Sequence, residues 1–437
     1  MIDLGPARLA AAAGALLASG EPEGDGPSRV VVDSRDLRPG DLFVALPGER
    51  VHGGEFAERA IEAGAWGVLV DPAHAPVGGT VLVAEDPLGA LGALARSWRR
   101  EIGCRVVGIT GSTGKTSTKD ILAALLRTRV RTHANRENLN TEIGLPLSLL
   151  EAPRGTAVAV LEMAMRGEGQ IAELAAIAEP DVGVIVNVGP VHLELLGTVE
   201  RVAAAKAELI RDLRPGAACV LPASEPLLDA HRRADLDTWS FGPAGEVMLL
   251  SYDHGHAEIE ARGERIELDL SYSEPHNLLN TLAAVAAAMA LGVRVAGPVD
   301  VRFSSLRGEV VELPGGVVVV NDCYNANPMS MRAALDHLAD SPAERRIAVL
   351  GTMAELGEGS AGFHREIGVH AAARAIDVLV PVGAEALAYL EGFEGEVHPV
   401  GSAEEAGALL EEVARPGDRV LVKGSRSAGL ERVLHLA

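Results

Sequence analysis

The sequence contains little cysteine, few aromatic residues and no long apolar run. Its three cysteines are too few and too far apart for a disulfide framework or a zinc site, and they fit a reducing cytoplasm: Cys104, Cys219 and Cys323. Aromatic residues make up 3 % of the chain, so its cores must be built from Ala, Val and Leu. The apolar run at 9–18 is shorter than the ~20 residues that cross a bilayer. We therefore expect it to form a helix packed on the first domain, with no membrane insertion.

Basic residues, and lysine above all, are also scarce. The net charge of −22 argues against the basic surface that nucleic-acid binding needs, but it allows an anionic small substrate at a locally positive site. Only four of the 39 Lys and Arg residues are lysines. Because Arg serves wherever a surface cation suffices, each lysine is either retained by chance or needed for its compact charge or modifiable amine. The four are Lys115, Lys119, Lys206 and Lys423, and we find no role for Lys119 in the sequence.

The stretch 106–120, VVGITGSTGKTSTKD, joins a β-branched run to a glycine turn and then to a helix-forming segment. This is the layout of a phosphate-binding loop, in which backbone N–H groups and a helix N-terminus face a polyphosphate. Lys115 would reach the β/γ-phosphates, and the Thr116 hydroxyl would bind Mg²⁺. The usual first glycine is replaced by Ile109, so an ordinary strand-to-helix turn is the alternative. The predicted nucleotide-binding residues are Gly111, Ser112, Thr113, Gly114, Lys115, Thr116 and Ser117.

Three polar residues downstream are candidate metal ligands. Glu162 ends the strand-like run VAVLE, the usual place for a Mg²⁺ ligand after a phosphate loop, although a surface helix glutamate is the alternative. His192 follows another strand-like run and is either a cap or a ligand. The spacing of its apolar neighbours places Lys206 on or beside the buried face of a helix, where a free ammonium is costly. Carbamylation by CO₂ would turn that amine into an anionic oxygen ligand for Mg²⁺, which spacing alone does not establish.

Length and the alternation of elements predict an α/β protein of three domains. A chain of 437 residues corresponds to about three domains. We predict a small α/β domain at 1–102, a central phosphate-loop domain with a mostly parallel sheet at 103–300, and a Rossmann-like domain at 301–437. Within the central domain, 237–270 is expected to form an antiparallel appendage.

Polar clusters follow several predicted strands, at the edge where parallel sheets bind ligands. Asn277 and Asn280 share one face at the start of an Ala-rich helix, where they would contact a nucleotide or simply cap the helix. The other clusters are Asp33-Ser34-Arg35, the amide-rich loop at 135–144, Asp322-Cys-Tyr-Asn325-Ala-Asn327, the segment LGTMAELG at 350–357, and Lys423-Gly-Ser-Arg426.

Taken together, these residues resemble the Mur ligase family, the ATP-dependent amino-acid ligases of peptidoglycan synthesis. The resemblance covers essentially the whole chain. The family core is matched by GSTGKTS, Glu162, NVGPVHLELLG with His192, AKAE around Lys206, HNLLN, and Arg307 with Asp322. The line DSR…PGDLFVALPGE resembles the uridine-nucleotide site shared by two members of the family, the one that adds D-alanyl-D-alanine and the one that adds diaminopimelate or lysine. One departure is His52-Gly-Gly-Glu-Phe56, where the family often reads Asp-Gly-His-x-Phe, so a His contact is not carried over there.

The resemblance implies a reaction and a set of roles. ATP would phosphorylate the C-terminal carboxylate of UDP-MurNAc-tripeptide, and the amine of D-alanyl-D-alanine would displace phosphate from the acyl phosphate. Catalytic roles fall to Lys115, Glu162, His192, Lys206 and Arg307. Thr116 and Glu162 would bind one Mg²⁺, and His192 with carbamylated Lys206 a second. The nucleotide would also meet Asn277, Asn280, Arg307 and Asp322. Substrate contacts would come from Ser34 and Arg35 (uridine diphosphate), Asn138, Asn140, Thr141 and Arg166 (muramoyl peptide), and Asn325, Asn327, Lys423 and Arg426 (dipeptide).

The segments LEMAMRGEGQIAEL, YNANPMSM, LGTMAELG and VLVKGSR point to the family member that accepts D-alanyl-D-alanine. The member that adds diaminopimelate or lysine is the main alternative, and it carries a different signature at YNANP. A folylpolyglutamate synthase would lack the first 100 residues. A bare NTPase or nucleotide-regulated binding protein would leave the set of Glu162, His192 and Lys206 unexplained. We expect a cytoplasmic monomer, and no residue is an obvious general base.

Overall fold

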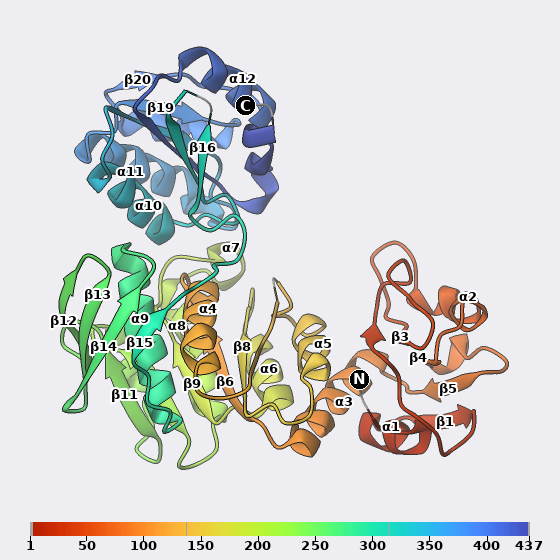
Figure 1. Ribbon diagram of the computed structural model, residues 1–437. Helices are drawn as coiled ribbons and strands as arrows, with labels where there is room; N and C mark the ends of the chain where they lie inside the picture. The colour runs from red at the N-terminus through yellow and green to blue at the C-terminus, as the bar shows by residue number, and fades with distance from the viewer. Residues whose placement is uncertain (1–2, 137, 314, 436–437) are drawn as a thin grey trace.

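The computed structural model describes residues 3–136, 138–313 and 315–435, and it contains three β-sheets of five, ten and six strands (Figure 1). Each sheet is covered by helices, in agreement with the predicted α/β class. Each also lies inside one of the three predicted ranges, although the domain boundaries themselves stay a prediction.

The first unit is a mostly parallel sheet in the order β1-β5-β4-β3-β2. The parallel strands are short, the two at the centre of the sheet, β3 and β4, are fully buried, and the loops carry the polar residues singled out in the sequence. The elements are α1 Pro6–Ala13, β1 Leu16–Ser19, β2 Val30–Val31, β3 Leu42–Val44, η1 Gly53–Phe56, α2 Ala57–Glu62, β4 Gly67–Val70, η2 Pro72–His74, β5 Thr80–Val83 and α3 Pro87–Ile102.

The prediction of one helix over 9–18 is wrong in its second half. The helix α1 ends at Ala13 because Gly14 takes the left-handed conformation, with φ 64°. The chain then forms strand β1, which pairs antiparallel with β5. An apolar run of this length fits either element, so periodicity did not separate the two.

The helix α3 joins the first unit to the second. The side chain of Trp98 is fully buried, and its indole N–H donates to the carbonyl oxygen of Ala152, the residue after α5, at 3.0 Å. Residues of α1, α3, α5 and α6 belong to one apolar core. The first and second units are therefore packed together through this helix.

The central sheet has the order β15-β14-β13-β12-β11-β10-β9-β6-β8-β7. Its middle strands are buried on both faces, as expected for parallel strands covered by helices on each side. The elements are β6 Arg105–Thr110, α4 Lys115–Arg127, β7 Thr132–Ala134, α5 Gly144–Glu151, β8 Val158–Glu162, α6 Gln170–Ala178, β9 Val182–Ile185, α7 Leu193–Leu196, α8 Val199–Asp212, β10 Ala218–Pro222, η3 Pro226–His231, β11 Asp237–Phe241, β12 Val247–Asp253, β13 His256–Ala261, β14 Glu264–Leu270, α9 Pro275–Ala290 and β15 Gly297–Val299.

The segment 237–270 is antiparallel only in part. The strands β12, β13 and β14 form an antiparallel meander, as predicted. The strand β11, in contrast, continues the parallel sheet and pairs in parallel with both β10 and the start of β12. The expectation of an entirely antiparallel appendage is therefore corrected for β11.

The third unit is a six-stranded sheet in the order β16-β17-β21-β18-β19-β20, parallel except for the pair β16/β17. Its elements are β16 Glu309–Leu313, β17 Val317–Asn321, α10 Pro328–Asp340, β18 Arg345–Leu350, η4 Gly357–Gly359, α11 Ser360–Ala373, β19 Val378–Pro381, η5 Glu385–Gly392, β20 Glu396–Val397, α12 Ala403–Val413, β21 Asp418–Lys423, η6 Arg426–Ala428 and η7 Leu430–His435.

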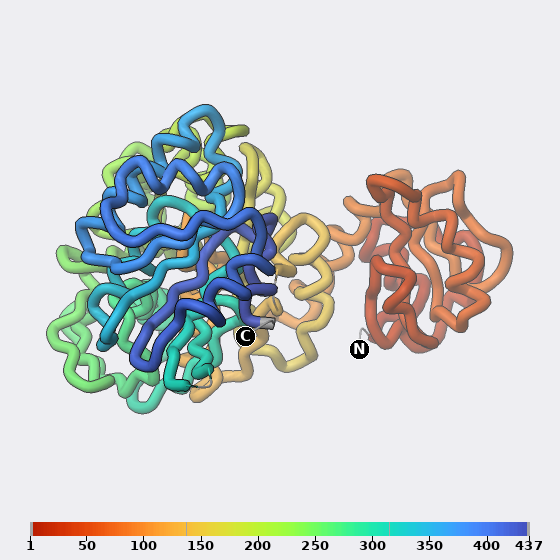
Figure 2. Tube along the Cα trace, turned by 90° about the horizontal axis from the view of Figure 1, so that it is seen from above, coloured from red at the N-terminus to blue at the C-terminus, as the bar shows by residue number. Residues whose placement is uncertain are grey.

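The third unit lies over the central one, whereas the first stands to the side, as Figures 1 and 2 show. The segment that crosses to the third unit is tied to the phosphate-loop helix, because the carboxylate of Asp120 accepts hydrogen bonds from the backbone N–H and the hydroxyl of Ser304, both at 3.0 Å. Across the described residues, every helix is too short or too polar to cross a membrane.

Candidate active site

The predicted phosphate-binding loop connects β6 to α4 at the edge of the central sheet that faces the third unit (Figure 1). The loop is braced from the segment after β9: the backbone N–H of Thr113 donates to Asn187 Oδ1 at 2.9 Å, and the hydroxyl of Ser112 donates to the carbonyl oxygen of Gly189 at 3.1 Å. The Lys115 Nζ donates to the carbonyl oxygen of Gly111 at 2.8 Å. The side chain of Lys115 therefore folds back over the loop, which is where a bound phosphate would meet its ammonium group. Ser117 lies in the first turn of α4.

Gly114 is required on two grounds. Its φ of 74° is left-handed, which favours glycine. A Cβ at this position would also lie 2.6 Å from Asn280 Oδ1, closer than a real contact allows. The start of α9 thus packs directly on the phosphate loop, which brings the predicted residue Asn280 to the loop's edge.

Glu162 forms a buried polar cluster with the phosphate loop. It is the last residue of β8, directly beside Ile109 of β6. Its Oε2 accepts from the Thr116 hydroxyl at 2.7 Å and its Oε1 from Asn140 Nδ2 at 2.8 Å. These three side chains are buried. The structure therefore joins Thr116 to Glu162, as the predicted first metal site requires, and it gives Asn140 the role of holding the carboxylate.

Lys119 has a place in the same network, which the sequence did not reveal. Its buried Nζ donates to the carbonyl oxygen of Asn135 at 3.0 Å and pairs with Asp120 at 3.1 Å. Asn135 in turn accepts from the backbone N–H of Glu162 at 2.9 Å. Lys119 thus holds Asn135 in place, and Asn135 in turn holds the backbone of Glu162. The scarcity of lysine singled out Lys119 in the sequence, but no spacing rule predicts that it contacts residue 135.

Lys206 is buried on α8, with 2 % of its surface exposed, as its helical spacing predicted. Burial, and to a smaller extent the ammonium of Lys115, hold the pKa of Lys206 well below its ordinary value. Burial also lowers the pKa of Lys115. Because a lysine with a depressed pKa is partly a neutral amine, Lys206 has the form that reacts with CO₂.

His192 meets a residue that sequence reasoning missed. It precedes α7 with a left-handed φ of 53°, and its Nδ1 is bonded to the carboxylate of Glu355 in the third unit. Burial lowers the pKa of His192, and Glu355 opposes this. Glu355 also has a left-handed φ, 62°, and lies 3.5 Å from the Nε of Arg166. Glu355 lies within the segment LGTMAELG, but that cluster supplied no individual residue to the predicted site.

Arg307 and Asp322 reach the site from the third unit. The guanidinium of Arg307 lies over the ring of Tyr324 at 4.1 Å, and it contributes to the lowered pKa of Lys115. The carboxylate of Asp322 accepts from Lys423 Nζ at 2.5 Å. Lys423 is buried and also donates to the carbonyl oxygen of Asn325 at 3.1 Å. The structure therefore places Lys423 behind Asp322 and not on an open dipeptide surface, which changes our expectation for that residue.

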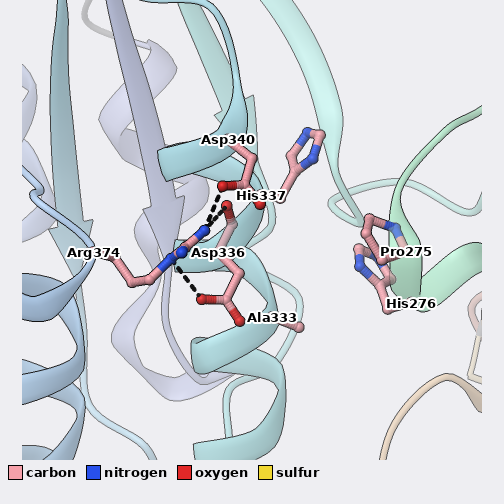
Figure 3. Close-up of a pocket in the computed structure, with 7 residues that line it drawn as sticks. All are labelled: Pro275, His276, Ala333, Asp336, His337, Asp340 and Arg374. Atoms are coloured by element: carbon pink, nitrogen blue, oxygen red, sulfur yellow. Dashed lines mark hydrogen bonds and ion pairs between the residues drawn. The ribbon is translucent and has the colours of Figure 1, made fainter.

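The start of α9, the helix that carries Asn277 and Asn280, contributes Pro275 and His276 to a cavity of about 350 Å³ whose other lining residues belong to the third unit (Figure 3). Asn280 Nδ2 donates to Asn277 Oδ1 at 3.3 Å, so the two share one face as predicted. In Figure 3, His276 faces His337 across the cavity. Burial lowers the pKa of both imidazoles, which are therefore neutral near pH 7. The cavity is lined by Pro275, His276, Ala333, Asp336, His337, Asp340 and Arg374.

The remaining predicted substrate residues are divided between buried and exposed positions. Asn327 is buried as the N-cap of α10, where its Oδ1 accepts from the backbone N–H of Ser330 at 3.0 Å. Its Nδ2 also reaches the carbonyl oxygen of Ser112 at 3.5 Å, so it links the third unit to the phosphate loop instead of facing an open site. The others have exposed side chains: Asn138, Thr141, Arg166, Asn325 and Arg426.

In the first unit, Ser34 and Arg35 follow β2 at the carboxyl edge of the sheet. The Arg35 guanidinium pairs with Asp33 and is 86 % exposed. At the same edge, the imidazoles of His52 and His74 stack at 4.2 Å, and a Cβ at Gly54 would lie 2.3 Å from the ring of His74. Because two parallel stacked rings cannot both point a nitrogen lone pair at one ion, we do not read this pair, with Asp71, as a metal site.

The fold and the site define a class of protein. Three family models match in order along the chain: the Mur ligase family catalytic domain at 28–98, the Mur ligase middle domain at 109–288, and the Mur ligase glutamate ligase domain at 306–426. The chain belongs to the Mur ligase family.

Within that family, the chain is similar to the UDP-N-acetylmuramoyl-tripeptide–D-alanyl-D-alanine ligases. That of Bacillus subtilis is 35 % identical, over 93 % of this chain and 92 % of the relative. That of Escherichia coli K12 is 32 % identical over the same shares. The crystal structure of MurF from Acinetobacter baumannii superposes with a TM-score of 0.87 at 28 % identity, over 98 % of this chain and 97 % of that one. MurF from Thermotoga maritima, solved with ADP, gives 0.82 at 33 % identity, over 93 % and 96 %. The predicted family and three-domain fold are confirmed.

Proposed function

We propose that this protein is an ATP-dependent ligase that joins D-alanyl-D-alanine to the C-terminal carboxylate of UDP-MurNAc-tripeptide, giving UDP-MurNAc-pentapeptide for peptidoglycan synthesis. The observation that carries the proposal is the buried cluster of Thr116, Glu162 and Asn140 on the phosphate loop, together with the buried amine of Lys206, whose pKa is lowered by burial and by the ammonium of Lys115 in the loop. A bare nucleotide-binding protein needs the loop but has no use for a buried amine with a depressed pKa. The three free, buried cysteines agree with a reducing cytoplasm as the place of the reaction.

We infer sites for two magnesium ions from the chemistry of the residues present. A hydroxyl oxygen and a carboxylate, from Thr116 and Glu162, are the hard oxygen ligands that Mg²⁺ prefers, and they already lie within hydrogen-bond distance of each other. The carbamate of Lys206 and the imidazole of His192 would hold a second ion. When bound, the ions supply charge neutralisation for the phosphates and for the acceptor carboxylate.

The chain's own groups position the nucleotide. Lys115, on the loop, would hold the β/γ-phosphates, and Arg307 would neutralise the γ-phosphate from the third unit. We place the nucleoside end against Asn277 and Asn280, on the helix whose start lines the cavity of Figure 3, with Asp322 at the ribose. Lys423 would keep Asp322 in place. The bound nucleotide would thus contact two domains at once and favour their closure.

The acceptor would extend from this site toward the first unit. We place the uridine diphosphate near Ser34 and Arg35 and the muramoyl peptide along Asn138, Thr141 and Arg166. The peptide carboxylate takes the γ-phosphoryl group and ADP leaves. The dipeptide amine then attacks the acyl carbon, the bond from that carbon to the phosphate oxygen breaks, and phosphate leaves; the surplus proton goes to phosphate or water.

The test is phosphate release from Mg²⁺-ATP with each candidate acceptor, with the product identified by mass spectrometry. We expect release that requires both UDP-MurNAc-tripeptide and D-alanyl-D-alanine. Release that requires UDP-MurNAc-dipeptide and a diamino acid would show that the protein catalyses the preceding step instead, the addition of the diamino acid. Release that is independent of any muramoyl substrate would refute ligation altogether.

A further inference from the structure

The carboxylate of Glu355 lies where the central and third units meet. The two residues that form this contact, Glu355 and His192, both have a left-handed backbone conformation. The φ of Glu355 is 62° and that of His192 is 53°, although neither residue is a glycine. Non-glycine residues in this region carry strain that the surrounding structure must overcome, and such strain collects at functional sites. A backbone hydrogen bond from the N–H of Glu194 to the carbonyl oxygen of Glu355, at 3.2 Å, fixes the pair.

The reaction centre is otherwise rich in cations. The guanidinium of Arg307 is close enough to the ammonium of Lys115 to contribute to its lowered pKa, so two cationic side chains face this centre. The carboxylate of Glu162 is already bonded to Thr116 and Asn140, and that of Asp322 to Lys423. An incoming amine nucleophile arrives as an ammonium ion and meets repulsion from these cations.

Glu355 is placed to offset that repulsion. Its side chain remains 34 % exposed, so a small ligand has access to it. Its present partners are both cationic or titratable nitrogen groups: His192 Nδ1 and, at 3.5 Å, Arg166 Nε. An ammonium group is equivalent to such a partner, because it donates charge-assisted hydrogen bonds to a carboxylate. Glu355 also belongs to the third unit, the one that carries the predicted dipeptide residues Asn325 and Arg426.

We propose that Glu355 binds the α-ammonium group of the amino-acid acceptor and holds it beside the site of acyl-phosphate formation. This deepens the proposed function and rests on it. The role is recognition of a positively charged nucleophile: Glu355 brings the ammonium nitrogen to the centre past the surrounding cations, before its proton is lost to phosphate or water.

The experiment compares two nucleophiles on one variant. Hydroxylamine is uncharged at neutral pH and traps an acyl phosphate as a hydroxamate, whereas D-alanyl-D-alanine is an ammonium ion. Glu355→Gln keeps the size of the side chain and removes its charge. We expect the variant to form hydroxamate at the wild-type rate, with unchanged KM for ATP and for UDP-MurNAc-tripeptide. Its KM for D-alanyl-D-alanine should rise about ten- to a hundredfold, the loss expected for a charge-assisted hydrogen bond.

Glu358→Gln is the matched control, because Glu358 lies three residues further on, in the short helix η4, with an exposed side chain. It should leave every parameter unchanged. Equal losses with hydroxylamine and dipeptide in Glu355→Gln would show that Glu355 only joins the two units, and would overturn the proposal, as would an unchanged KM for the dipeptide. Absence of hydroxamate from the wild-type protein would instead refute the proposed function, so the two failures are distinguishable.

Discussion

The buried amine of Lys206 should make the ligand-free protein less stable than a variant without it. Lys206→Met keeps an unbranched side chain of similar length and removes the amine. The pKa of Lys206 is depressed by burial and by Lys115, with no carboxylate or hydrogen bond opposing the shift. The lysine is therefore retained at a cost to stability, which is expected where a residue serves chemistry.

The size of the effect follows from the burial. An unpartnered polar group in a protein interior costs about 1–3 kcal/mol. For a domain of about 200 residues, each kcal/mol shifts Tm by about 2–4 °C. We expect Lys206→Met to raise the Tm of the central domain by about 2–12 °C at pH 7, without nucleotide or Mg²⁺ and in buffer freed of CO₂, while abolishing ligation.

The pH dependence has a definite sign. In the unfolded chain the lysine pKa is about 10.4, and in the folded protein it is lower. Between the two values the unfolded state binds more protons, so the wild-type stability rises with pH across that window. The advantage of Lys206→Met should therefore be largest at low pH and shrink as the pH approaches about 10.4.

The assay is calorimetry of wild type, Lys206→Met and Lys119→Met, each with and without bicarbonate. Lys119 is the matched control because it is a buried lysine whose Nζ has two partners, Asn135 and Asp120, so its replacement should lower Tm. Bicarbonate should raise the Tm of the wild type and leave Lys206→Met unchanged. A Lys206→Met protein that is less stable than wild type, with no bicarbonate effect in either, would refute the reasoning.

Three further substitutions test the geometry of the site. Asn140→Ala removes a hydrogen bond to the buried carboxylate of Glu162, worth about 1.5–3 kcal/mol, so the Mg²⁺ concentration needed for half-maximal ligation should rise at least about tenfold; an unchanged Mg²⁺ titration would contradict this. Gly114→Ala should abolish nucleotide binding in calorimetric titration, because the added Cβ meets Asn280 and the left-handed φ disfavours alanine; retained affinity would show that the loop relaxes. Asn327→Ala should destabilise the third unit by about 1 kcal/mol through loss of its cap, seen in thermal melting, and a stability equal to wild type would show the cap to be dispensable.

Local patterns predicted the strand, loop and helix of the phosphate loop and the position of Glu162 at the end of the neighbouring strand. The β-branched run before Gly111 and the helix after Gly114 are adjacent in sequence, so their geometry needs no tertiary information. Glu162 was found because a strand end in a parallel sheet has a known direction. The buried face of the helix around Lys206 followed from its apolar spacing.

Contacts between distant segments could not be predicted in the same way. The pairing of His192 with Glu355 depends on how the third unit lies over the central one, and no periodicity encodes it. Lys119 and Asn135 meet because a loop folds back on α4. Lys423 was correctly placed at the end of a strand and Asn327 in the loop after one, but their side chains turn inward, to Asp322 and to a helix cap, because buried polar groups must be paired.

The central claim is that this site activates a peptide carboxylate by phosphorylation. The most direct test is a ligation with UDP-MurNAc-tripeptide labelled with ¹⁸O in its C-terminal carboxylate, followed by mass spectrometry of the released phosphate. The acyl-phosphate route predicts one ¹⁸O atom in each phosphate per peptide bond formed, because the carboxylate oxygen that takes the phosphoryl group leaves with it. Unlabelled phosphate, released alongside normal pentapeptide formation, would contradict the account.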